Sequence, residues 1–296
     1  MFLGKDLSNI ATEKAGIIKY QCPTIISKQE KIALDVITQY ANNNDSQYYI
    51  YDEDFNISKS IKSLNQYHYH CKKSLFKNEK DITIKEVNYY FDNISLLGSH
   101  QIINLATALT ASIVAANKLG VSLENDKIAT AIANSKWPAR LEKITSGNIY
   151  NKIIGECNIK KDEMTLILDG SHNIQGSMTV ANFIDNFRNN HQNSKVIMIN
   201  AMLCDKDYQG FIANIGNKID YYIASKISNE NKSLCPKLLT NIIANFTTNY
   251  DKSNNLQQAI DLAITKIRQY KRNNDEYQIL LIITGSLYFA GEFLLW

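Results

Sequence analysis

The chain has 296 residues, 45% of them hydrophobic, which is enough to bury the core of one large or two medium domains. A net charge of +3 without a basic stripe excludes a nucleic-acid-binding surface, and five dispersed cysteines without a short Cys/His spacing argue against a zinc site. Such an odd set of scattered thiols indicates a reduced, cytoplasmic protein.

The first half of the chain mixes helical and strand patterns. Residues 29–41 carry apolar side chains near helical spacing. Three alternating stretches that are typical of antiparallel strands follow, at residues 48–55, 66–71 and 82–91. A helix is then predicted from Ser99, its candidate N-cap, to Gly120, and a second over residues 124–135, before Pro138.

The second half alternates apolar strands with helices. Four stretches are predicted to be strands: MTLILDG from Met164, KVIMINAM from Lys195, DYYIAS from Asp220 and QILLIIT from Gln278. Helices are predicted near His172 and Tyr208, and over residues 236–246 and 255–270. This alternation predicts an α/β fold with a mostly parallel sheet that is covered on both faces.

The stretch from Tyr277 to Trp296 is almost long enough to span a bilayer. However, Gly285 and Ser286 interrupt it, and Glu292 lies inside it. We therefore expect a buried strand, a turn and a short helix, and no membrane association.

Polar residues follow the predicted strands, at the edge where open α/β sheets bind ligands. The candidate site residues there are Asp169, His172, Asn173, Asp205, Lys206, Asp207 and Ser286. A carboxylate at a strand end, followed by a helix N-terminus, suits a ribose hydroxyl and a phosphate. The spacing equally supports an alternative interpretation, in which Asp169 only caps a helix and His172 is a surface residue.

Two more polar residues have possible ligand roles. Asn104 shares a helix face with His100, and its amide has the donor and acceptor that a purine edge requires. Arg140, in the segment KWPARLE, is placed to clamp a phosphate with two hydrogen bonds. Read in isolation, a solvated helix face for Asn104 and an interdomain salt bridge for Arg140 are the favoured alternatives.

Several motifs, taken in order, resemble folylpolyglutamate synthases, including bifunctional dihydrofolate synthases, a branch of the Mur ligase superfamily. They are LG, IATEKAGIIK, LLGSHQIINLATA, WPARLE, LDGSHN, AMLCDKD and TGS, and they run essentially from Leu3 to the C-terminal end. The resemblance implies a Mur-ligase-like ATP-binding central domain over residues 1–145 and a Rossmann-like C-terminal domain over residues 146–296. It also implies an enzyme that uses ATP and Mg²⁺ to join L-glutamate to a folate carboxylate through an acyl phosphate.

The resemblance also assigns roles to individual residues. Asn104 is expected to contact the adenine, Arg140 the phosphates and Asp169 the ribose, with His172 packed beside the nucleotide. Lys14 matches the lysine that the family carbamylates, which turns a cation into an anion that helps to hold magnesium. Because a lysine must lose its proton to react with carbon dioxide, we expect an apolar setting around Lys14. A helix-end lysine with its amine in water is the alternative.

The sequence departs from the family pattern at its beginning. No phosphate-binding loop of the form G-x-x-x-x-G-K-[ST] occurs in it, and the family's metal ligands are expected upstream of Met1. We therefore expect a truncated first domain with an exposed apolar sheet edge and a need for a separate N-terminal segment. Ser171 and Ile174 stand where the family usually has Ala and Pro, and Ile174 loses some preorganisation of the helix start.

Three hypotheses follow from these patterns. The chain is part of an active folylpolyglutamate synthase, an inactive remnant of one, or a module that binds a nucleotide or a partner without turnover. Dihydropteroate and folate both remain open as substrates, because the residues that distinguish them are expected upstream.

Overall fold

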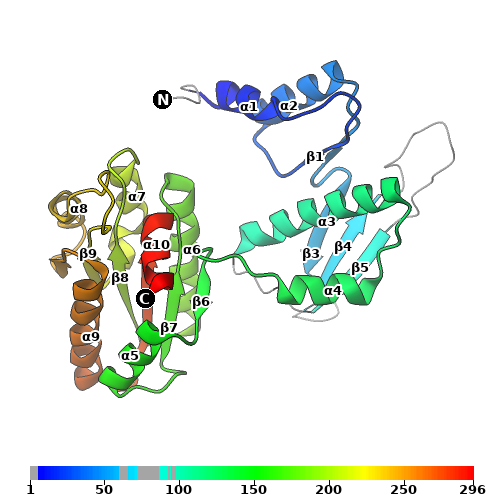
Figure 1. The fold of residues 1–296 in the computed structure, drawn as a ribbon. Coiled ribbons are helices and arrows are strands. Elements are labelled where there is room, and N and C mark those ends of the chain that lie inside the picture. The colour runs from blue at the N-terminus through cyan, green and yellow to red at the C-terminus, as the bar shows by residue number, and fades with distance from the viewer. Residues whose placement is uncertain (1–5, 60–65, 73–86, 93, 95–97) are drawn as a thin grey trace. The chain divides into compact units, whose positions relative to one another are not determined.

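The computed structural model describes residues 6–59, 66–72, 87–92, 94 and 98–296 (Figure 1). Contacts divide the chain into two compact units, and after the helices of the first unit the division falls between Ser135 and Lys136. This lies before the domain boundary that we predicted at residues 145 and 146. The reason is the strand β6 (Glu142–Ile144), which pairs with the sheet of the second unit.

The first unit begins with a small two-stranded arrangement. Its elements are α1 (Leu7–Ala15), β1 (Thr24–Ile26), α2 (Lys31–Asn43) and β2 (Tyr48–Ile50). Helix α1 begins where the carboxylate of Asp6 accepts a hydrogen bond from the Asn9 N–H at 2.8 Å. Strands β1 and β2 are parallel. The prediction of an antiparallel strand at the start of residues 48–55 was therefore wrong, because β2 pairs with β1, which the sequence patterns did not reveal.

A three-stranded antiparallel sheet forms the rest of the first unit. Its strands are β3 (Phe55–Lys59), β4 (Tyr67–Cys71) and β5 (Val87–Phe91), and it packs against α3 (Ser99–Leu119) and α4 (Asn125–Asn134). In β4, Tyr69 and Cys71 are buried against the helices, as period-two alternation requires. The predicted strand at 82–91 is confirmed from Val87 onward, and residues 82–86 lie outside the described residues.

Helix α3 is the one described helix that is long and apolar enough to cross a membrane, judged by length and composition alone. Its buried side chains Ala106, Leu109 and Ile113 pack with the strands of the three-stranded sheet, which is what a core helix does. Gly120 follows it with a φ of +66°, as expected of a glycine just beyond a helix end.

The second unit contains a six-stranded sheet. Its order is β10 (Tyr250–Lys252), β9 (Tyr221–Ala224), β8 (Ser194–Asn200), β11 (Gln278–Thr284), β7 (Met164–Leu168) and β6. All neighbours are parallel except β6 and β7, which are antiparallel. The predicted α/β fold with a mostly parallel sheet is confirmed, although β6 and β10 were not predicted.

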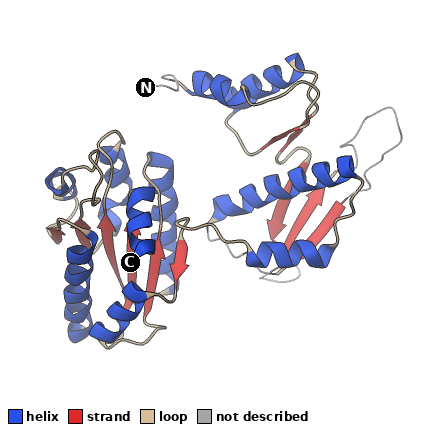
Figure 2. Cartoon of the chain, in the orientation of Figure 1, coloured by secondary structure: helices blue, strands red, loops and turns tan. Residues whose placement is uncertain are grey.

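Helices cover both faces of this sheet (Figure 2). One face packs against α6 (Ile174–Asn190), α7 (Tyr208–Ile215) and α8 (Pro236–Ile243), and the other against α5 (Asn148–Cys157), α9 (Leu256–Asn273) and α10 (Leu287–Leu295). In β8, Val196 and Met198 face the first set while Ile197 and Ile199 face the second. Both faces are buried, which explains why the strands read as continuous apolar runs.

The C-terminal stretch folds as the sequence predicts. Strand β11 is followed by Gly285 and Ser286 and then by α10, so the apolar run is divided between a buried strand and a short helix. Helix α5 (Asn148–Cys157) was not predicted; it begins two residues after the boundary that we placed between the domains.

Candidate functional site

The carboxyl ends of β7, β11 and β8 form the candidate site. These strands are neighbours in the sheet, and each is followed by a helix N-terminus. Helices α6 and α7 leave toward one face of the sheet and α10 leaves toward the other. The strand ends therefore lie at a point where the connections diverge, which is where open α/β sheets bind ligands.

Three predicted site residues are the caps of these helices. Asn173 accepts a hydrogen bond from the Gly176 N–H at 2.8 Å and begins α6. Asp207 does the same for α7 with a Gly210 N–H at 2.8 Å, and Ser286 begins α10 by accepting from the Tyr288 N–H at 3.1 Å. The first turn of each helix still points other N–H groups outward, so this edge favours anions.

Asp169 is buried inside the strand-end region, with 3% of its surface exposed. One carboxylate oxygen accepts from the Leu141 N–H at 2.9 Å, and the other accepts from the Ser171 N–H at 2.9 Å and the Thr284 hydroxyl at 3.4 Å. Since Asn173 is the cap of α6, Asp169 does not cap that helix. Its carboxylate binds backbone and side-chain groups of the protein itself.

Arg140 lies in a strained turn. Its neighbours Ala139 and Leu141 have φ values of +56° and +47°, a left-handed conformation that costs non-glycine residues roughly 1–2 kcal/mol each. The Ala139 N–H donates to the Glu142 carboxylate at 2.9 Å, and the Ala139 carbonyl accepts from the Gly170 N–H at 2.8 Å. Together with the hydrogen bond from the Leu141 N–H to Asp169, these contacts fix the backbone on both sides of Arg140.

The Arg140 side chain is half-buried, and within the described part of the chain it forms no ion pair. A guanidinium with a fixed backbone and no carboxylate partner retains its five N–H donors for an anionic ligand. Within the described residues of the second unit, the geometry leaves the Arg140 guanidinium without a carboxylate partner, as the phosphate-clamp interpretation requires.

His172 follows Asp169 and Gly170 on the same edge. Its Nδ1 lies 2.9 Å from the Gly170 carbonyl oxygen, and because a carbonyl only accepts, Nδ1 carries the hydrogen. This bond fixes the ring and leaves Nε2 available to a ligand. His172 is half-buried, which suits a ring that packs beside another planar group.

Gly285 follows β11, and Asn200 is the last residue of β8, at the same edge of the sheet. The sequence analysis did not identify Asn200. Its side chain is fully buried, donates to the Thr284 carbonyl at 3.2 Å and accepts from the Tyr222 hydroxyl at 2.8 Å. Gly285 has a φ of +111°, and a Cβ there would lie 2.5 Å from the Ala201 carbonyl oxygen. An amide at the end of a buried apolar strand was the available signal for Asn200.

Asp205 and Lys206 precede the cap of α7. Their side chains pair at 3.5 Å and are partly exposed, at 48% and 33%. This contact pairs a carboxylate and an ammonium in the segment between β8 and α7. An exposed pair of this kind stabilises the fold little, so both groups remain free to exchange one partner for another.

The remaining two predicted site residues belong to the first unit. Asn104 is exposed on α3, and its amide donates to the Gln101 side chain at 3.2 Å. Lys14 is exposed in the last turn of α1. The apolar setting that we expected around Lys14 is therefore not formed by the described residues of this unit.

The donor set of the second unit fits a nucleotide better than a metal ion. Arg140, His172 and the helix N-termini all suit phosphate groups. In contrast, the described residues contain no cluster of three or more His, Cys, Asp or Glu side chains placed to hold a metal. These residues therefore do not assemble a Mg²⁺ site, and we assign no step to the metal.

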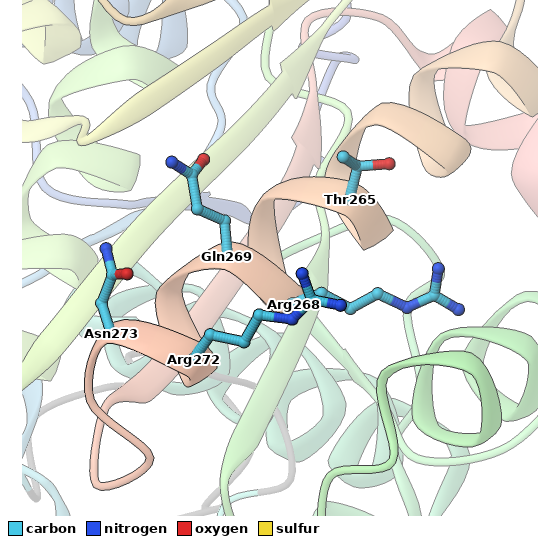
Figure 3. A pocket seen from close by; sticks show the side chains of 5 residues that line it. All are labelled: Thr265, Arg268, Gln269, Arg272 and Asn273. Atoms are coloured by element: carbon cyan, nitrogen blue, oxygen red, sulfur yellow. The ribbon is translucent and has the colours of Figure 1, made fainter.

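A depression of about 500 Å³ lies elsewhere, on the outer surface of α9 (Figure 3). It is lined by Thr265, Arg268, Gln269, Arg272 and Asn273. None of the predicted site residues is among them. Arg268 also donates to the Glu156 carbonyl at 2.7 Å, so part of this surface binds α5 to α9.

Comparisons with known proteins point to one family. The family model described as dihydrofolate synthetase, C-terminal domain, matches residues 152–295. The chain is 25% identical to a probable dihydrofolate synthetase of Schizosaccharomyces pombe over 98% of its own length. It is 23% identical to the dihydrofolate synthase/folylpolyglutamate synthase of Bacillus subtilis, also over 98%. The chain is similar to the dihydrofolate synthase/folylpolyglutamate synthase family.

Solved structures agree with the fold of this family. The Mycobacterium tuberculosis folylpolyglutamate synthase complexed with ADP and AMPPCP matches 98% of the chain with a TM-score of 0.75 and 22% identity. E. coli FolC in complex with DHPP and ADP matches 99% with a TM-score of 0.71 and 17% identity. The chain covers 59% and 57% of these two proteins, and 61% and 58% of the two curated relatives.

Proposed function

We propose that this chain forms the nucleotide-binding part of an ATP-dependent ligase that adds L-glutamate to the glutamate carboxylate of a folate. The observation that carries the proposal is the setting of Arg140. Hydrogen bonds fix the backbone on both sides of this residue, and it has no ionic partner among the described residues. It also lies beside the strand ends of a chain that is similar to this family. The relatives whose structures contain ADP support a nucleotide as its ligand.

In the proposed reaction, the folate carboxylate attacks the γ-phosphorus of ATP and ADP leaves. The amine of L-glutamate then attacks the resulting acyl phosphate, forms the amide bond and releases phosphate. Arg140 would bind phosphate oxygens, and His172 would orient the nucleotide through its fixed ring. Most of the rate enhancement would come from positioning and from neutralising phosphoryl charge.

Other parts of the proposal belong to the first unit. Asn104 would contact the adenine, and Lys14, once carbamylated, would help to hold Mg²⁺ with ligands from outside these 296 residues. The complex of an E. coli relative with DHPP supports a folate precursor as an alternative acceptor of the same ligase reaction. The free cysteines support our proposal of a cytoplasmic protein.

A second function is favoured by one sequence observation. No G-x-x-x-x-G-K-[ST] motif occurs in the 296 residues, so the backbone cradle that such a loop supplies to phosphates is not encoded in them. A nucleotide-binding module without turnover, or an inactive relative of the ligase, fits this observation.

The test is ATP-dependent addition of labelled glutamate to tetrahydrofolate by the purified chain, with magnesium and bicarbonate. The same assay is repeated with the phosphate-loop segment of a relative added as a separate polypeptide. Turnover in either arm that Arg140→Ala abolishes supports the ligase. Binding of ADP without turnover in either arm supports the module, and a folded chain that neither turns over nor binds ADP contradicts both functions.

A further inference from the structure

We propose that His68 and His70 form a binding site for one divalent transition-metal ion that favours imidazole ligands. The two residues lie in β4, in the three-stranded sheet of the first unit. The site is independent of the proposed nucleotide binding, because it uses none of the residues of the candidate functional site. The sequence analysis did not single out this pair.

The pleat of β4 places both imidazoles on the outward face of the sheet. Tyr69 and Cys71 are buried against the helices, so the histidines that alternate with them point to the opposite face. Both histidines are half-buried. Two imidazoles at positions i and i+2 of one strand are therefore neighbours on a surface that an ion can reach from solvent.

The two rings converge on a single oxygen atom of the neighbouring strand β5. Nε2 of His68 lies 2.7 Å from Oδ1 of Asn88, and Nδ1 of His70 lies 3.2 Å from the same atom. Because an amide oxygen only accepts hydrogen bonds, each of these ring nitrogens directs its hydrogen toward it. Two imidazole nitrogens and an amide oxygen are thus directed at one point, and such donors suit divalent ions such as Ni²⁺ and Zn²⁺.

Stacking on an aromatic ring holds one of the two imidazoles in place. The ring of His68 lies 4.6 Å from the ring of Tyr90, centroid to centroid, and the two planes differ by 8°. Tyr90 is also the residue of β5 that pairs with His68, and Asn88 pairs with His70 in the same ladder. The donors are therefore fixed by a paired strand rather than by a loop, which preorganises them for a ligand.

Metal binding needs no net loss of protons from neutral imidazoles. Each neutral ring has one hydrogen, which moves through water to its other nitrogen when the metal ion takes the lone pair. The oxygen of Asn88 then becomes a ligand, and water fills the other positions. The described residues contain no group of three or more His, Cys, Asp or Glu side chains, so this site should hold an ion less tightly than a closed structural site.

Ni²⁺ is the probe for the test, because imidazole is among its preferred ligands whereas thiolates compete for Zn²⁺. The exposed cysteines of the described residues, Cys22, Cys204 and Cys235, are alkylated first. Calorimetric titration of the folded chain should then give one Ni²⁺ site. A folded chain that binds no Ni²⁺ would overturn the proposal.

The variants His68→Ala and His70→Ala should each raise the Kd for Ni²⁺ roughly tenfold or more, since even loss of a residue that only supports a ligand costs roughly 10–100-fold. The double variant should bind little worse than either single variant, because one remaining imidazole no longer chelates the ion. His191→Ala is the matched control, since His191 lies in the second unit against Phe187, and it should keep the wild-type Kd.

Asn88→Asp separates a metal site from a hydrogen-bonded pair of histidines. A carboxylate in place of the amide adds a negative charge at the point where the rings converge, and should lower the Kd for Ni²⁺ at least about fivefold. An Asn88 that only accepts hydrogen bonds from the rings predicts no such gain, and an unchanged Kd would overturn the proposal.

The imidazole signals in NMR spectra of the wild-type chain provide a readout that needs no variant to fold. Ni²⁺ is paramagnetic, so a substoichiometric amount should broaden the signals of His68 and His70 before those of His191. Equal broadening of all three, or a Kd that neither alanine variant changes, would show only scattered surface binding and would overturn the proposal.

Discussion

Replacing Gly285 by alanine should destabilise the second unit strongly. Gly285 joins β11 to α10 with a φ of +111°, and a Cβ there would approach the Ala201 carbonyl oxygen and the Asn200 amide nitrogen to 2.5 Å. Both are groups of the neighbouring strand end, and one is backbone, so neither can rotate away freely. The strand end must shift for the methyl group to fit.

The magnitude follows from three contributions. The unfavourable backbone conformation costs roughly 1–2 kcal/mol, and overpacking adds roughly 1–3 kcal/mol. Displacing Asn200 also weakens its bond to the Thr284 carbonyl, at 3.2 Å, for about 1 kcal/mol more. The expected loss is therefore roughly 3–6 kcal/mol, a large share of the ~5–15 kcal/mol that stabilises a typical domain.

Urea unfolding followed by tryptophan fluorescence measures this loss, because both tryptophans, Trp137 and Trp296, belong to the second unit. Gly147→Ala is the matched control: Gly147 has a φ of +103°, and a Cβ there would meet nothing within 4 Å. The control should lose only the conformational part, ~1–2 kcal/mol. Equal losses in the two variants would refute the steric argument for Gly285.

Four further predictions concern stability and thiol chemistry. Burial raises the pKa of the Cys71 and Cys157 thiols from 9.0 to about 11, so at pH 8 both should react with a disulfide reagent roughly a hundredfold more slowly than the exposed cysteines. Because the pKa of both thiols is higher in the folded than in the unfolded chain, burial of the neutral thiols contributes fully to stability below pH 9. This contribution is lost as the pH rises toward 11, so urea unfolding midpoints that do not change between pH 9 and 11 would contradict the prediction. Asn158, exposed at the end of α5 with a φ of +51°, should tolerate glycine, whereas Asn158→Ala should lower the free energy of unfolding by ~1 kcal/mol; equal midpoints would contradict a left-handed cap. Tyr222→Phe leaves the buried Asn200 side-chain oxygen without its donor and should lower the free energy of unfolding by ~1–3 kcal/mol in the same urea assay. An unchanged free energy of unfolding would contradict this prediction.

Most strands of the second unit's sheet could be predicted from the sequence because they are buried on both faces. Runs such as MTLIL and QILLIIT are apolar throughout, and each is followed by a polar turn and a helix. The three N-caps at these turns could also be predicted, because Asn, Asp or Ser directly before a helix is a local signal for a helix start. Strand β10 was missed because its three residues, Tyr250–Lys252, are all exposed and carry no apolar pattern.

The contacts of Asp169 could not be predicted from the sequence. Its partners Leu141 and Thr284 lie 28 and 115 residues away, and no spacing rule connects them. The left-handed turn around Arg140 was equally hidden, because the usual marker of such a turn is glycine and neither Ala139 nor Leu141 provides it. The role of Lys14 stays a prediction: its apolar setting was inferred from the chemistry of carbamylation, and the described residues of its own unit leave its side chain exposed.

The position of β11 has a consequence for how the protein is made. This strand lies between β8 and β7, yet the ribosome produces it after every other strand of the sheet. Until residues 278–284 emerge, β7 and β8 have no common neighbour, and their apolar edges remain open to other nascent chains. The second unit therefore completes the edge that carries the candidate site in one late step, and we expect chaperones that shield unpaired strands to matter most during synthesis of its last part.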